Sequence, residues 1–232
     1  MTQSPNGGVA LIACPAVVRE LADDRRTTVR TVELDVGLHR TPARLTAALQ
    51  QAIGEVEADA AVTTVVLGYG LCSNAVLGLR AGRCPLVMPR VDDCVALVLG
   101  SNEAFAEQAR QVAGTYYLSR GWIESHATIF DEHEAMAQRY GEEQATRLTG
   151  LLLAHYTRLA LVDTGRYALT AYREFGQDRA ARFGLAYEEI AGTTALVDAL
   201  LAGPWDERFV VVPPGGEVTF EQFHRFPANK ED

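Results

Sequence analysis

Three of the four cysteines lie where short apolar runs, typical of buried strands, come to an end. Cys14 ends the run VALIAC, Cys72 follows TTVVLGYGL, and Cys94 follows CPLVMP and the loop RVDD. The carboxyl ends of parallel strands lie at one edge of a sheet, where ligand sites form in the loops that follow. We therefore expect Cys14, Cys72 and Cys94 to meet in one pocket.

Cys84 is expected to lie apart from the other cysteines. It precedes its strand, CPLVMP, and so belongs to the opposite edge of the sheet. A strand of about five residues spans about 17 Å, which is too far for Cys84 to join the others. The topology therefore divides the cysteines into three plus one.

Three thiolates fit two kinds of metal centre. A [4Fe–4S] cluster held by three cysteines has one iron open for a substrate. Zinc with three sulfur ligands takes its fourth ligand from water, histidine or substrate. Two other interpretations stay open: the thiols could be buried core residues, or Cys72 alone could be a nucleophile. Helices expected to begin near Cys72 and Cys94 would lower the pKa of both thiols.

Small and polar residues beside Cys72 are candidates for cofactor binding. The sequence GYG begins like a dinucleotide fingerprint, but its third glycine is misplaced and no acidic residue ends the next strand. A tight turn that brings backbone close to the site is the alternative. A short helix is expected at Ser73–Leu79. The cofactor-binding candidates are Gly68, Gly70, Ser73 and Asn74.

Charged residues that follow the strands could take part in chemistry at the same edge. Asp163 and Asp93 are candidate catalytic carboxylates, with helix capping as the alternative for each. Arg90 and Arg120 could clamp a carboxylate or phosphate. The histidines best placed to supply a fourth metal ligand follow the fifth strand: His126 and His133.

The composition limits the kinds of partner. The chain has 232 residues, 48% of them hydrophobic, and a formal net charge of -9. Such an acidic chain is expected to bind neither nucleic acid nor an anionic membrane. The start MTQSPNGG lacks the pattern of a secretory signal, and no apolar run approaches the ~20 residues that span a bilayer. We expect a cytoplasmic protein with reduced thiols and a small-molecule substrate.

Apolar runs of strand length alternate with helical patterns along the chain. This alternation predicts an α/β fold with a mostly parallel sheet and helices on both faces. One domain is expected over residues 9–216, with tails at 1–8 and 217–232. Possible lobes are 9–123 and 159–216, joined by a helical segment, 124–158. The expected strands are 9–14, 28–37, 63–70, 84–89, 115–122, 159–165, 185–192 and 209–215.

The chain resembles domain of unknown function 1638 over Val9–Gly216. The segments that carry the resemblance are IACPAVVREL, GYGLCSNAVLGL, PLVMPRVDDCVALVLGS, YYLSRGWIE, HYTRLALVDTG and GPWDERFVVVPPG. Its most specific marks are GLC(G/S)N and PRxxDC, and Cys14, Cys72 and Cys94 match its cysteines. Asp92 stands where a histidine is expected, and Pro15 where a glycine is expected.

The resemblance implies little chemistry, because the family has no established activity. It is often mentioned beside corrinoid-dependent methyl-transfer systems, which implies a methyltransferase or corrinoid protein as a partner. Two functions are therefore expected as alternatives. One is a metalloenzyme, a transferase or lyase, acting on a small molecule at the three-cysteine centre. The other is a non-catalytic accessory or binding protein for such a methyl-transfer system.

Overall fold

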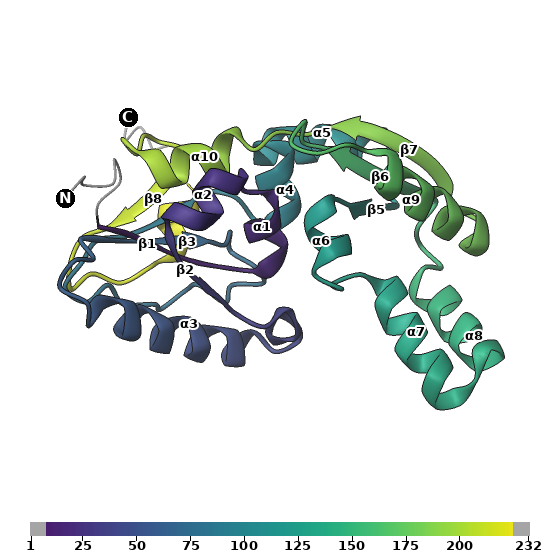
Figure 1. Cartoon of the computed structure of the whole chain (residues 1–232), viewed down its shortest axis with the longest axis horizontal. Coiled ribbons are helices and arrows are strands. Elements are labelled where there is room, and N and C mark those ends of the chain that lie inside the picture. The colour runs from purple at the N-terminus through teal and green to yellow at the C-terminus, as the bar shows by residue number, and fades with distance from the viewer. Residues whose placement is uncertain (1–7, 225–232) are drawn as a thin grey trace, which may run out of the picture.

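The computed structural model describes residues 8–224 and contains two β-sheets (Figure 1). The first sheet has the order β2-β1-β3-β4-β8, in which β8 alone is antiparallel. The second sheet, β5-β6-β7, is parallel throughout. The expected α/β fold with a mostly parallel sheet is confirmed. The strands are β1 (Val9–Ala13), β2 (Arg30–Glu33), β3 (Thr64–Gly68), β4 (Leu86–Pro89), β5 (Thr115–Leu118), β6 (Arg158–Asp163), β7 (Ala186–Ala191) and β8 (Phe209–Val212).

Helices surround both sheets. In the first sheet, α3 packs against β1 and β3, and α10 packs against β3 and β4 from the opposite face. In the second sheet, α9 packs against β6 and β7. The helices are α1 (Pro15–Glu20), α2 (Asp23–Thr28), the 3-10 helix η1 (Val36–Arg40), α3 (Pro42–Glu57), α4 (Cys94–Leu99), α5 (Asn102–Gln111), α6 (Arg120–Glu124), α7 (Ile129–Tyr140), α8 (Glu142–Leu152), α9 (Thr170–Phe183), α10 (Ala195–Ala202) and α11 (Phe220–Phe223).

The apolar runs of the sequence form the central strands of the first sheet. Every residue of β3 and β4 is buried, as is all of β1 after Val9. Parallel strands covered by helices on both faces need such continuous apolar runs, because neither face meets water. Each sheet takes strands from both sides of the segment 124–158, and the division into lobes stays a prediction. No helix within residues 8–224 combines the length and apolar character needed to cross a bilayer.

The largest difference from expectation is the segment Ser73–Leu79, which forms turns instead of a helix. Cys72, Ser73 and Asn74 have φ angles of 46°, 59° and 67°. This left-handed backbone is unfavourable for residues with a Cβ and cannot begin a right-handed helix. The expected helix at Ser73–Leu79 is therefore wrong.

Two expected strands are shorter than their sequence pattern. The strand expected at 28–37 ends at Glu33, because Asp35 accepts a hydrogen bond from Gly37 N and begins η1. The strand expected at 115–122 ends at Leu118, because Ser119 caps α6 through Gly121 N. In both cases a polar side chain pairs with the backbone two residues ahead and starts a helical turn.

A buried carboxylate joins the two sheets. Glu20, at the end of α1, is 0% exposed. Its carboxylate accepts hydrogen bonds from Ser119 Oγ at 2.6 Å and Gly121 N at 2.8 Å, beyond β5, and from Thr164 Oγ1 at 2.9 Å, beyond β6. Helices α1 and α6 pack together here, in the middle of Figure 1. This junction sets the position of the first sheet's carboxyl edge against the second sheet.

Candidate functional site

The three cysteines expected to meet are held side by side by the backbone. Ala13 pairs with Gly68, which places Cys14 level with the residue after β3. Leu71 N donates to Val91 O and Cys72 N donates to Asp92 O, both at 2.9 Å. These bonds extend the parallel pairing beyond β3 and β4. Cys72 therefore lies beside the loop that leads into α4.

The three thiols are close enough for their charges to interact. A negative charge on Cys14 would raise the pKa of Cys72, and charges on both would raise the pKa of Cys94. Cys14 and Cys72 are buried and Cys94 is half-buried. The carboxyl edge of the first sheet thus brings together the three cysteines that the strand pattern indicated.

Cys84 lies elsewhere, before β4. Its Sγ donates to Val62 O at 3.3 Å, and its backbone N–H donates to Glu57 Oε1 at 2.8 Å. The charged groups that act on it are Arg83 and Glu57, and none of the other cysteines is among them. Cys84 is therefore a buried residue at the amino end of its strand.

Burial determines the protonation of the three thiols. It raises the pKa of Cys72 to about 12, and it raises the pKa of Cys14 and of Cys94 as well. The expected lowering by helix N-termini is wrong, because desolvation of the thiolate outweighs it and because a turn follows Cys72. A thiol that stays protonated is a poor nucleophile. This argues against Cys72 acting alone as a nucleophile.

Two glycines allow the loops to come together. A Cβ on Gly70 would lie 2.5 Å from Val91 O, and one on Gly68 would lie 2.6 Å from the Cβ of Ala13. Gly70 therefore lets two backbone segments approach closely, and Gly68 leaves room for the side chains of Ala13 and Val17. Ser73 and Asn74 are exposed in the left-handed turn. Cofactor binding by these four residues stays a prediction.

Tyr69 and His39 belong to the same edge, although the sequence analysis did not select them. Tyr69 follows β3, is 1% exposed, and its hydroxyl has no hydrogen-bond partner within residues 8–224. The ring of His39, in η1, stacks on it at 5.8 Å between centroids. Burial lowers the pKa of His39, which favours the neutral imidazole. Both residues follow strands of the first sheet, and this position is the signal that could have identified them.

Two small cavities lie along this edge, facing the second sheet. The Cys94 cavity measures about 240 Å³ and is lined by Cys94, Val95, Thr115, Tyr116, Tyr117, Trp122, Ala127 and Tyr156. The His39 cavity measures about 210 Å³ and is lined by Val36, Gly37, His39, Arg40, His126, Ala127, Thr128 and Glu132. Ala127 lines both, so the two cavities are neighbours. Cys94 lines the first of them, whereas Cys14 and Cys72 line neither, so the expected single pocket is not found among these cavities.

The two histidines proposed as a fourth ligand have different surroundings. His126 lines the His39 cavity and pairs with Asp131 at 3.0 Å. His133 is buried in the hairpin of α7 and α8, where its ring nitrogens contact Thr149 at 3.0 Å and Glu142 at 3.2 Å. His126 is thus beside the candidate site, and His133 is a packing residue of the hairpin.

The candidate carboxylates have structural partners. Asp93 caps α4 by accepting hydrogen bonds from Val95 N and Ala96 N, both at 2.9 Å. Asp163, at the end of β6, accepts one from Gly165 N at 2.8 Å. Each therefore holds the turn after its strand. A catalytic role for either stays a prediction.

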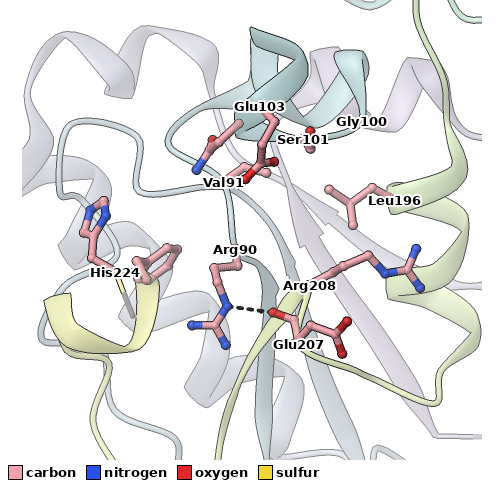
Figure 2. Close-up of a pocket in the computed structure, with 11 residues that line it drawn as sticks. Arg90, Val91, Gly100, Ser101, Glu103, Leu196, Glu207, Arg208 and His224 are labelled. Carbon is pink, nitrogen blue, oxygen red and sulfur yellow. Dashed lines mark hydrogen bonds between the residues drawn. The ribbon is translucent and has the colours of Figure 1, made fainter. Parts of the chain in front are cut away.

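A larger cavity, of about 530 Å³, lies beyond the end of β4 (Figure 2). Arg90 lines it and donates to two backbone carbonyls, Glu207 O and Phe209 O, each at 2.8 Å. Arg208 also lines it and pairs with Asp206. Its lining contains no cysteine. Arg120, the other candidate clamp, contacts the ring of Tyr167.

Within residues 8–224, no group of three or more His, Cys, Asp or Glu side chains is arranged to hold a metal ion. The thiols of Cys14, Cys72 and Cys94 thus gather without adopting ligand geometry. A cysteine side chain has one rotatable bond with three staggered positions. Rotation about that bond moves the sulfur while the backbone stays in place.

A family model described as a protein of unknown function (DUF1638) matches residues 33–201. The matched region begins in β2 and continues into α10. It therefore contains Cys72 and Cys94, whereas Cys14 lies before it. No curated protein and no solved structure matches the chain.

Proposed function

The chain belongs to the DUF1638 family, and we propose that it is a metalloprotein in which Cys14, Cys72 and Cys94 hold one metal centre. The observation that carries the proposal is the backbone pairing that places Cys14, Cys72 and the loop leading to Cys94 side by side at one edge of the first sheet. Thiolates are the usual ligands of iron–sulfur clusters and of many zinc sites.

The protonation of the thiols fits this role. Burial raises the pKa of all three thiols, and the charges of neighbouring cysteines add to this effect at Cys72 and Cys94. A bound metal ion counters this effect, because a coordinating thiol loses its proton outright. The centre would form as the thiols rotate towards a common point, with the backbone loops already in position.

The substrate of the proposed centre is a small molecule with an uncharged, largely apolar body and one group that can bind the metal. The Cys94 cavity opens beside the least buried of the three cysteines, and its lining contains no charged side chain. Its rings of Tyr116, Tyr117 and Trp122 offer apolar contact surface. When bound, a centre with one open position supplies a Lewis acid that can bind a thiol, hydroxyl or carboxylate.

Metal analysis of the purified protein tests the proposal. We expect protein prepared without oxygen either to be brown with bound iron and sulfide, or to be colourless with one zinc. Serine at position 14, 72 or 94 should abolish metal binding. The matched control is Cys84→Ser, which should leave the metal content unchanged. Wild-type protein that binds no metal, or loss of metal in the control alone, would contradict the proposal.

The alternative is a non-catalytic accessory protein for a corrinoid or methyl-transfer system. No contact within the described residues favours such a partner. The two functions differ in a direct measurement. An enzyme should bind a small thiol or carboxylate at the metal-loaded centre, seen as a change in its absorption spectrum. An accessory protein should leave that spectrum unchanged and bind a corrinoid protein instead.

A further inference from the structure

The hydroxyl of Tyr69 is buried at the carboxyl edge of the first sheet, where the described residues offer it no hydrogen-bond partner. The side chain is 1% exposed, and no group within residues 8–224 forms a hydrogen bond with this hydroxyl. Folded proteins rarely leave a buried hydroxyl unpaired, unless a ligand, ion or water completes it. The unpaired hydroxyl therefore indicates a group that is bound here when the site is complete.

The position of Tyr69 relates it to all three cysteines. It follows Gly68, which pairs with Ala13, so it lies level with Cys14. Leu71 N donates to Val91 O and Cys72 N donates to Asp92 O, both at 2.9 Å, so the strand end that carries Tyr69 also lies beside the loop that leads to Cys94. The stacked ring of His39 restrains the tyrosine ring. Tyr69 is thus held by packing at the sheet edge where the three cysteines lie.

We infer that Tyr69 is a positioning residue whose hydroxyl donates a hydrogen bond to a metal-bound thiolate sulfur of the three-cysteine centre. This inference rests on the proposed metal centre. A phenol is a hydrogen-bond donor at neutral pH, and a thiol sulfur is only a weak acceptor. A metal-bound thiolate carries negative charge and is the better acceptor. The hydroxyl has no partner within residues 8–224, and it would gain one when a metal-bound sulfur lies within its reach.

The variant Tyr69→Phe separates this role from a structural one. Without metal, we expect its unfolding temperature to equal or exceed that of the wild type, because it loses only an unpaired hydroxyl. With metal, we expect its affinity for Zn²⁺ or Co²⁺ to fall about tenfold, the usual effect of removing a partner of a ligand. The sulfur-to-cobalt absorption band should shift. If the protein carries a cluster, its reduction potential should fall.

The variant Tyr167→Phe is the matched control. This hydroxyl donates to Val162 O at 2.6 Å and accepts from Arg120 N at 3.2 Å, so both of its bonds lie within the protein. Its loss should lower the unfolding temperature of the metal-free protein and leave metal affinity unchanged. The two tyrosine variants therefore have opposite expected signatures.

The outcomes distinguish this inference from the proposed function. If the wild-type protein binds no Zn²⁺, Co²⁺ or cluster, the proposed function fails. If the wild type binds metal through its three cysteines and Tyr69→Phe binds it within twofold, the inference fails and the centre stands. If Tyr69→Phe destabilises the metal-free protein as much as Tyr167→Phe does, its hydroxyl already has a protein partner, which also overturns the inference.

Discussion

Replacing Glu20 with alanine should weaken the junction between the two sheets. The buried carboxylate accepts hydrogen bonds from Ser119 Oγ, Gly121 N and Thr164 Oγ1 at 2.6–2.9 Å. A buried donor left unpaired costs about 1–3 kcal/mol. The two hydroxyls can rotate towards other acceptors, and Gly121 N keeps Ser119 Oγ as a second acceptor at 3.1 Å. The remaining loss is of the order of one unpaired donor, so we expect Glu20→Ala to lower the free energy of unfolding by about 1–3 kcal/mol, out of the 5–15 kcal/mol typical of folded proteins.

Two further variants isolate the cause of this loss. Glu20→Gln keeps one carbonyl oxygen, and the hydroxyl of Thr164 can turn to accept a bond from the amide. It should cost about 1 kcal/mol. Thr164→Val removes one donor, so its effect and that of Glu20→Ala should be less than additive in a double-mutant cycle. Urea unfolding followed by circular dichroism measures all of these values. A cost below 1 kcal/mol for Glu20→Ala would refute the reasoning.

Two further predictions concern the cysteine loops. Because burial raises the pKa of Cys72 in the folded protein to about 12, above its unfolded value near 8.5, the metal-free protein should be fully stable below about pH 8. Its free energy of unfolding should then fall by about 1.4 kcal/mol per pH unit from this thiol above about pH 9. Urea titrations of wild type and Cys72→Ser between pH 8 and 10 measure how the free energy of unfolding changes with pH. The same pH dependence in both proteins would contradict the prediction. Gly70→Ala places a Cβ 2.5 Å from Val91 O, so it should lower the free energy of unfolding by about 1–3 kcal/mol and weaken metal binding. An unchanged stability together with an unchanged metal affinity would show that the loops need no close approach.

The buried strands of the first sheet could be predicted because their apolar runs have one structural solution. Runs such as VALIA and TVVLG have no polar face to turn to water, so strands covered on both sides are the natural outcome. Strand direction alone then predicts that Cys14, Cys72 and Cys94 lie at one edge of the sheet.

The features that the sequence did not predict depend on contacts between segments that are distant in the chain. The pKa values of the thiols rise because packing buries them. The local sequence indicates only nearby helix N-termini, which would lower these pKa values. Glu20 was not selected because its acceptor role needs Ser119 and Thr164, about 100 and 144 residues away. Tyr69 and His39 also follow strands, but their sequence positions alone do not distinguish them from the other polar residues at strand ends.

The turn at Cys72–Asn74 shows why the candidate site resisted a local interpretation. Three successive left-handed residues cost roughly 1–2 kcal/mol each, and local preference favours the helix that was expected. The turn persists because Leu71 and Cys72 bond to the Val91–Asp92 backbone, which Gly70 allows to approach. Relaxation into a helix would break this pairing and move Cys72 away from Cys94. The same contact between two loops therefore holds the strained turn in place and keeps Cys72 beside the loop that leads to Cys94.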